Sequence, residues 1–304
     1  MCARKIAFYS PKGGVGKTTG VMNAAGILAA KYKASVLIID ADPSANVSSG
    51  FSATAETVRA AYPELLTEAM KRNIGVPPKK APLASVVSAF PEINEHEHPA
   101  KQQARKRIFI APAQAGQSSA SLLIRTEDAI MKHNYGLELS GKPRDYMHLA
   151  RFFSPLEDMF DYILIDAPGA IAGAMYLEAV CAADYIVSPA EADIWSPAAL
   201  SRVIDVTKLA CGLSKKKIHF LGYYLSKYDA RRTRSDVAIK EGIRDKDLLF
   251  STAIPNSSSV KNAQLATDIL AFTRPGDDVT KCFEMLTDEI VKKIKKIERN
   301  SRKG

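Results

Sequence analysis

Short runs of apolar residues, each ended by turn-forming or charged residues, recur along the chain and predict buried strands. The clearest are Lys5–Ser10, Ser35–Asp40, Tyr162–Asp166 and Tyr185–Ser188. They are rich in β-branched and aromatic side chains, which is typical of strands covered on both faces. Further strands are predicted at Arg107–Ala111, His219–Leu225 and Leu249–Ile254.

The segment between the first two runs has the spacing of a helix. In Lys17–Lys31 the apolar residues Val21, Ala25 and Leu28 recur three or four positions apart. A strand, a loop, a helix and a second strand therefore follow one another, as in the units that build parallel sheets. This alternation predicts an α/β fold, a mostly parallel twisted sheet with helices on both faces.

Length and pattern together predict the domain organisation. The 304 residues suit one large α/β domain, and we expect a single domain over residues 1–304. The pattern is least clear over residues 51–106, where a helical pattern near Glu56–Arg72 is followed by the stretches VPPKKAP, NEHEHP and KQQARKR. We expect an insertion or elaboration there. His96 and His98 stand in this polar sequence and are interpreted as solvated side chains.

Composition narrows the class of protein. Hydrophobic residues make up 46% of the chain and charged residues 25%, which argues against a largely disordered or membrane-spanning protein. Strand-like sequence begins within the first ten residues, so we expect a cytoplasmic protein. The four cysteines lack the spacing of a disulfide framework or a zinc site. The net charge of +9 would attract DNA, RNA or an anionic membrane face, and it equally fits a solvated basic surface.

A glycine-rich segment after the first run carries the strongest chemical signal. Ser10–Thr19 reads SPKGGVGKTT, which follows the phosphate-loop pattern G-x-x-x-x-G-K-[ST] except that Pro11 replaces the first glycine. Its glycines let backbone N–H groups converge on phosphate oxygens, and the following helix directs its positive end at the same anion. Lys17 can reach the β- and γ-phosphates, and the Thr18 hydroxyl can bind magnesium. We therefore predict an ATP-binding, ATP-hydrolysing protein.

The segment PKGGVGKTT resembles the deviant Walker A loop of the ParA/MinD family of P-loop ATPases, and most closely that of ParA/Soj-type partition proteins. The resemblance implies ATP as substrate, Mg²⁺ as cofactor and a homodimer that forms with ATP. It also implies that Lys12 contacts the nucleotide of the partner subunit and Lys17 that of its own. The loop residues that it places around ATP are Lys12, Gly13, Gly14, Val15, Gly16, Lys17, Thr18 and Thr19.

The segment DADPSAN, which begins at Asp40, resembles the family's D-x-D-P-Q-x-N segment, with Ser44 where glutamine is usual. A phosphoryl-transfer site needs a residue that positions the attacking water and a carboxylate that holds magnesium. We expect Asp42 to position the water and Asp40 to belong to the magnesium shell, so that Lys12, Lys17 and Asp42 form the catalytic set. The alternative interpretation is that one aspartate merely caps the next turn.

The segment FDYILIDAPG, which begins at Phe160, resembles the family's Walker B segment. By that resemblance Asp166 binds magnesium, through water, together with Thr18 and Asp40. Pro168 and Gly169 would begin a second switch segment, and Gly169 replaces the more common second proline.

Two late segments extend the resemblance. Leu225–Ser235 resembles the D-x-R-T-x-L-S region of ParA proteins, and Thr252–Asn256 resembles their T-x-I-P-R. In that family the loop after I-P lies against adenine, which implies base contacts for Pro255 and Asn256. Basic residues near both segments meet DNA in some relatives, and the matching residues are Arg231, Arg232 and Arg234. These arginines also fit a solvated helix start.

The function expected from this resemblance is that of a ParA-like ATPase. ATP would close a homodimer that binds DNA nonspecifically and positions or segregates a plasmid, a chromosome or other cargo, and hydrolysis would reset the dimer. A ParB-like or other adaptor would stimulate hydrolysis, and the protein would be associated with the nucleoid. A third class, a metabolic or redox enzyme on the same scaffold, needs paired cysteines or a substrate pocket that the sequence does not indicate.

The main alternative is a MinD-like positioning ATPase on the membrane. The basic carboxyl-terminal stretch IVKKIKKIERNSRKG superficially fits an amphipathic membrane anchor. Its apolar residues, however, continue one helical stripe that is more simply explained by packing on the domain. The stripe consists of Val279, Phe283, Leu286, Ile290, Ile294 and Ile297.

Overall fold

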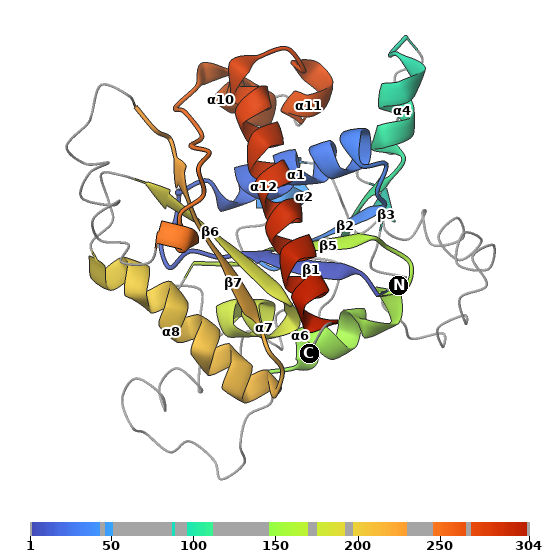
Figure 1. The fold of residues 1–304 in the computed structure, drawn as a ribbon. Coiled ribbons are helices and arrows are strands. Elements are labelled where there is room, and N and C mark those ends of the chain that lie inside the picture. Colours follow the sequence, from blue (N-terminus) through green and yellow to red (C-terminus); the bar gives the residue numbers. More distant parts are fainter. Residues whose placement is uncertain are drawn as a thin grey trace.

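A seven-stranded sheet forms the centre of the molecule, in the order β3-β4-β2-β5-β1-β6-β7 (Figure 1). The strands are β1 (Arg4–Phe8), β2 (Val36–Asp40), β3 (Val87–Ser88), β4 (Ile108–Ala111), β5 (Tyr162–Asp166), β6 (Tyr185–Glu191) and β7 (His219–Ser226). Six of them are parallel, and β3 pairs antiparallel with β4 at the edge. The predicted α/β class with a mostly parallel sheet is thereby confirmed. This is a computed structural model, which describes residues 2–42, 46–50, 87–88, 96–111, 146–169, 175–191, 197–229, 246–265 and 269–302.

Helices cover both faces of the sheet because side chains alternate between the faces along each strand. Ile6 and Phe8 of β1 join one apolar cluster, and Ala7 and Tyr9 join the other. The first face is covered by α1 (Lys17–Lys31), α4 (Pro99–Arg105), α10 (Ser258–Leu265), α11 (Leu270–Thr273) and α12 (Asp278–Ser301). The second is covered by α6 (His148–Phe153), α7 (Met175–Ala182) and α8 (Pro197–Ser214). Three short elements complete the described chain: α2 (Asn46–Gly50), η2 (Ser154–Leu156) and η3 (Lys246–Leu248).

Helix α1 has the predicted bounds and is enclosed. Every residue from Gly20 to Ala29 is buried, because the sheet lies beneath the helix while α4, α11 and α12 pack against it. The apolar stripe of α12 faces the same cluster, with Phe283, Leu286 and Ile294 at most 3% exposed. This confirms the prediction that the stripe packs on the domain. No helix in the described part of the chain has the length and apolar character needed to span a bilayer.

The predicted strand at Leu249–Ile254 is wrong. Leu249 and Pro255 form only isolated parallel bridges, to Tyr223 and Tyr228. Between these bridges the pairing with β7 is interrupted, because the N–H groups of Ser251 and Thr252 donate to a side chain of α12 instead of to a strand.

Part of the predicted insertion packs on the domain. His98 caps α4 by accepting a hydrogen bond from the Ala100 N–H at 3.2 Å. Arg105, at the end of α4, pairs with Glu97 at 2.8 Å and lies 4.6 Å above the centre of the Phe272 ring in α11. Residues 51–86 and 89–95, which include the helical pattern near Glu56–Arg72, lie outside the described residues.

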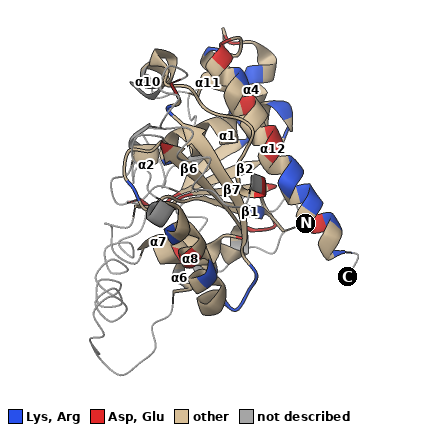
Figure 2. Cartoon of the chain, turned by 60° about the vertical axis from the view of Figure 1, so that its left-hand side comes forward, with Lys and Arg blue, Asp and Glu red and all other residues tan. Residues whose placement is uncertain are grey.

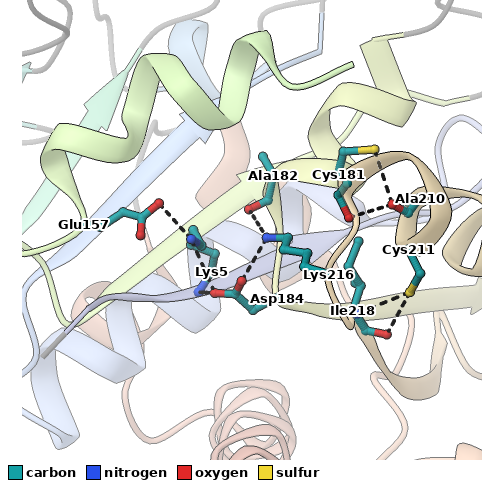
Figure 3. Close-up of polar contacts among 10 residues, drawn as sticks. Lys5, Glu157, Cys181, Ala182, Asp184, Ala210, Cys211, Lys216 and Ile218 are labelled. Carbon is teal, nitrogen blue, oxygen red and sulfur yellow. Dashed lines mark hydrogen bonds and ion pairs between the residues drawn. The ribbon is translucent and has the colours of Figure 1, made fainter. Parts of the chain in front are cut away.

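At the amino edge of the sheet, where the parallel strands begin, charged side chains pair with one another (Figure 3). The Lys5 Nζ lies 2.8 Å from Glu157 Oε1 and 3.7 Å from Asp184 Oδ2. The other Asp184 oxygen accepts a hydrogen bond from Lys216 Nζ at 2.9 Å. These contacts tie together the starts of β1, β6 and β7. Beside them, the free thiols of Cys181 and Cys211 lie close to backbone carbonyls.

Candidate functional site

The glycine-rich loop joins the end of β1 to the start of α1 at the carboxyl edge of the sheet, where ligands bind in α/β folds. Gly14 and Gly16 have φ values of 72° and 90°, a left-handed conformation that favours glycine. Gly16 stands at the N-cap position of α1, and Gly13 and Gly14 are exposed. The loop thus presents accessible backbone N–H groups directly before a helix amino terminus, the arrangement that binds phosphate.

The end of β7 holds this loop in place. The Ser226 hydroxyl donates to the Val15 carbonyl at 2.7 Å, and the Tyr224 hydroxyl donates to the Gly16 carbonyl at 3.3 Å. Sequence reasoning did not single out either residue. The available signal was that Tyr224 stands near the end of the strand predicted at His219–Leu225 and Ser226 directly after it, at the edge where the loop must lie.

Lys17 and Thr18, the first two residues of α1, point back to the loop and to β5. The buried Lys17 ammonium donates to the Lys12 carbonyl at 3.1 Å. Burial lowers the pKa of Lys17, and the nearby charges of Asp166 and Asp42 oppose that shift. The Thr18 hydroxyl donates to Asp166 Oδ2 at 2.6 Å. The structure therefore brings together Lys17, Thr18 and Asp166, which the sequence predicted for one site.

Asp166 is fully buried at the end of β5, and its environment suits a cation. Its second oxygen, Oδ1, is buried without a hydrogen-bond partner in the described structure. Burial raises the pKa of Asp166 to about 7, and the charges of Asp40 and Asp42 add to this, whereas Thr18 and Lys17 act against it. A hard divalent cation takes oxygen ligands of this kind, so the Asp166 carboxylate and the Thr18 hydroxyl fit Mg²⁺.

Asp40 lies beside Asp166 because β2 and β5 are neighbours and place these two residues in register. Its Oδ2 accepts hydrogen bonds from the Ser48 N–H at 2.8 Å and the Ser48 hydroxyl at 2.5 Å. Its Oδ1 accepts the Asp42 N–H at 3.3 Å. Burial raises the pKa of Asp40, and these donors counter the shift. Ser48 was not predicted; its signal was a hydroxyl two residues beyond the DADPSAN segment.

The segment after β5 approaches the loop closely. A side-chain carbon added at Gly169 would lie 3.6 to 3.7 Å from the backbone of Pro11, Lys12 and Gly13. The backbone that follows Asp166 therefore packs against the backbone of the phosphate loop.

Pro255 and Asn256 run beside the residues that follow β7. The Tyr228 N–H donates to the Ile254 carbonyl at 2.8 Å, and the Asn256 N–H donates to the Tyr228 carbonyl at 2.9 Å. Asn256 is exposed. Because Ser226 contacts the phosphate loop two residues earlier, these contacts place Pro255 and Asn256 at the same edge of the sheet. Arg231, Arg232 and Arg234 lie outside the described residues, as do residues 43–45 of the DADPSAN segment.

Comparisons with known proteins show which family and fold this chain shares. Residues 3–220 match the family model described as an AAA domain. The chromosome-partitioning ATPase Soj of Thermus thermophilus is 25% identical over 295 residues, which cover 96% of this chain and 96% of that protein.

Two solved structures share the fold. The structure of apo McdA from Cyanothece superposes with a TM-score of 0.65 at 21% identity, over 95% of this chain and 99% of that one. Cobyrinic acid a,c-diamide synthase from Mycobacterium smegmatis, with a bound ATP analogue and magnesium, also gives 0.65, at 17% identity over 95% of this chain and 94% of that one. At these identities the similarity extends to the fold alone.

Proposed function

Since the chain belongs to the AAA domain family and to the ParA/MinD family of P-loop ATPases, we propose that it binds Mg–ATP at the loop that ends in Thr19 and hydrolyses it. One observation carries the proposal. The Thr18 hydroxyl and the Asp166 carboxylate lie 2.6 Å apart beside the phosphate loop, and the other Asp166 oxygen is buried without a partner in the described structure.

In this mechanism each predicted residue has one task. The N–H groups of Gly13–Thr19 and the Lys17 ammonium bind the phosphates, and Pro255 and Asn256 contact the base. Thr18, Asp40 and, through water, Asp166 would hold the cation. When bound, Mg²⁺ neutralises charge on the β- and γ-phosphate oxygens.

Hydrolysis and dimer closure depend on the two remaining residues of the catalytic set. Asp42 orients the attacking water. It lies two residues after the buried Asp40, and its N–H donates to the Asp40 carboxylate. Lys12 extends to the phosphates of a second subunit when ATP closes the homodimer. Hydrolysis then removes the contacts that favour the closed dimer.

We further propose that the ATP-bound dimer positions cargo on DNA, with an adaptor protein that stimulates hydrolysis. Similarity to the chromosome-partitioning ATPase Soj supports this assignment. The described surface adds a physical argument, because the last three turns of α12 carry a row of exposed cations, visible as blue segments in Figure 2. We call this row the α12 basic stripe; it consists of Lys292, Lys295, Lys296 and Arg299 of the helix and Arg302, which directly follows it.

The stripe fits a phosphate backbone better than a bilayer. Each of its residues has another three or four positions away, so they share one face of the helix, and no ion pair involves them in the described structure. A membrane anchor of this kind would need an exposed apolar face, but the apolar face of α12 is buried in the core. Phosphate contacts by such side chains give nonspecific, salt-dependent binding to DNA.

The test measures binding to nonspecific duplex DNA with ATP, ADP or no nucleotide, over a range of salt concentrations. Salt-sensitive binding that requires ATP is expected, and Lys17→Ala should abolish it. Asp42→Ala should retain ATP-dependent binding while losing hydrolysis, and Lys12→Ala should lose ATP-dependent dimerisation. Binding that ignores the nucleotide would contradict the ATP-dependent part of the proposal, and binding to anionic vesicles instead of DNA would favour the membrane alternative.

Two variants locate the DNA surface. One replaces Lys295, Lys296 and Arg299 with alanine, and the other replaces Arg231, Arg232 and Arg234. Each phosphate contact that is lost should reduce the slope of log affinity against log salt by about 0.9. The set whose removal flattens the slope, with ATP hydrolysis in the absence of DNA unchanged, contacts the phosphates.

A further inference from the structure

The segment Phe250–Asn256 leads from the core to the proposed base contacts, and its second and third residues are held by α12. Its two ends follow β7, where the Phe250 N–H donates to the Tyr223 carbonyl and the Ile254 N–H to the Leu225 carbonyl, each at 2.8 Å. Between these points the pairing with β7 is interrupted. The conformation there must therefore be set by another part of the molecule.

Glu289 supplies that constraint. Its Oε2 accepts the Ser251 N–H at 2.9 Å, and its Oε1 accepts the Thr252 N–H at 2.9 Å together with a short hydrogen bond from the Thr252 hydroxyl. One carboxylate thus satisfies two consecutive N–H groups and a side-chain donor. Burial raises the pKa of Glu289, but these donors lower it by more, so that the pKa lies below its ordinary value.

The next turn of α12 holds the beginning of the same segment. Lys293 donates to the Leu221 carbonyl at 2.7 Å and the Asp247 carbonyl at 2.6 Å, and its ammonium lies 4.5 Å from the centre of the Phe250 ring. Two adjacent turns of one helix therefore bind the chain between Asp247 and Thr252, shortly before Pro255.

Helix α12 is itself fixed to the helix that follows the phosphate loop. Lys31, at the end of α1, lies 2.7 Å from both Glu284 and Asp288, and the Tyr32 hydroxyl donates to Asp288 at 2.8 Å. The position of Glu289 relative to the phosphate loop is consequently defined by a packed and hydrogen-bonded helix pair. A residue held in this way can set the distance between a base-binding segment and a phosphate-binding loop.

We propose that Glu289 is a positioning residue for nucleobase binding: it fixes the Ser251–Thr252 backbone so that Pro255 and Asn256 meet the base of a nucleotide whose phosphates lie on the Gly13–Thr18 loop. The inference rests on the proposed function, in which this segment contacts adenine. It assigns to α12 a role in ligand affinity beyond its role in the core.

The experiment compares the affinity for ATP with that for inorganic tripolyphosphate, which lacks a base, by titration calorimetry with Mg²⁺. Glu289→Ala should weaken ATP binding about tenfold, as expected for the loss of hydrogen bonds to a charged acceptor, and leave tripolyphosphate binding unchanged. Thr252→Val removes one donor only and should cause a smaller loss, about threefold, with the same selectivity. Glu298→Gln is the matched control, because it alters the ion pair of α12 with Arg4, which reaches neither the segment nor α1.

The outcomes separate the two proposals. Equal losses for ATP and tripolyphosphate in Glu289→Ala would assign the residue to general stability and overturn the inference, as would an unchanged affinity for ATP. Wild-type protein that binds ATP no more tightly than tripolyphosphate would refute the base contact itself, and the inference would fail with it. Thermal unfolding of each variant verifies that the comparison is made on folded protein.

Discussion

At the amino edge of the sheet the Asp184 carboxylate lies between two lysines. At the carboxyl edge the Asp166 carboxylate accepts one hydrogen bond from a hydroxyl, and its second oxygen has no hydrogen-bond partner in the described structure. Asp184 is about one-third exposed and Asp166 is fully buried. The first edge pairs its charges within the chain. The second keeps carboxylates in a dry environment with neutral donors, which is costly unless a cation binds there.

This difference suggests that the two edges serve different purposes. Charges that neutralise one another stabilise the fold and leave little for a ligand to do. Buried carboxylates that lack hydrogen-bond partners destabilise the fold, and a cation that binds beside them removes this destabilisation. Such arrangements are common at functional sites. Removal of a carboxylate charge at the carboxyl edge should therefore reduce ATP hydrolysis without destabilising the protein. Removal of such a charge at the amino edge should reduce stability without changing ATP hydrolysis.

The largest effect is expected for Asp166→Asn. ATP hydrolysis should fall by about 100-fold or more, because the charge that holds the cation is lost. Stability without nucleotide or magnesium should be equal or higher, because the pKa of Asp166 is raised to about 7 and ionisation in the folded state is unfavourable.

The sign of the pH dependence follows from that shift. The folded pKa of about 7 lies above the ordinary value of 3.8, so the destabilisation by Asp166 grows between these two values and is complete above pH 7. Urea unfolding at pH 5 and pH 8 should show a larger advantage for Asp166→Asn at pH 8. A variant less stable than wild type at pH 8 would show that the carboxylate supports the fold.

An intermediate effect is expected for Gly20→Ala, which disturbs the carboxyl edge without changing a charge. The added carbon would lie 2.5 Å from the Tyr224 hydroxyl and 3.1 Å from the Phe8 ring. Both rings are buried, so we expect a loss of about 1–3 kcal/mol in the free energy of unfolding. ATP binding should weaken as well, because the Tyr224 hydroxyl would be displaced from the Gly16 carbonyl.

Gly212 in α8 provides the control for that substitution. An added carbon there meets no other atom within 4 Å. Gly212→Ala should therefore stabilise the protein by about 0.5–1 kcal/mol and leave ATP binding unchanged. If both alanine variants behaved alike in thermal unfolding, close packing of Tyr224 against α1 would not be the cause.

The smallest effect is expected for Asp184→Asn at the amino edge. It removes the charge between Lys5 and Lys216 while keeping the shape of the side chain, and we expect a loss of about 1 kcal/mol or less in the free energy of unfolding. The loss should shrink in 1 M salt, because the pairs are partly exposed. ATP affinity and hydrolysis should not change; a reduction would show that the two edges are coupled.

The sequence predicted the parts of the molecule in which one local pattern determines the outcome. The bounds of α1 and most of the strands followed from apolar spacing and turn residues, and the neighbourhood of Lys17, Thr18 and Asp166 followed from matched motifs on adjacent strands. The residues that complete the site come from distant segments. Ser226 and Ser48 bear hydroxyls of common types, and only the folded sheet brings them to Val15 and Asp40.

The incorrect strand at Leu249–Ile254 has the same origin. Its apolar residues fit a strand pattern, but Ser251 and Thr252 bond to Glu289, which is 37 or more residues away in the sequence. A long-range side-chain acceptor that competes for backbone N–H groups leaves no local signal. For the same reason the role proposed for Glu289 depends on the structure.

The central position of β1 has a consequence for how the protein is made. Among the strands that the structure describes β1 is translated first, yet its neighbours in the sheet are β5, which begins at Tyr162, and β6, which begins at Tyr185. Until those segments are synthesised, the apolar side chains of β1 and α1 lack the strands against which they pack in the native sheet. Closing such long connections slows folding and exposes apolar surface to aggregation. The segment that would bind phosphate is thus translated well before the strands that flank it in the sheet.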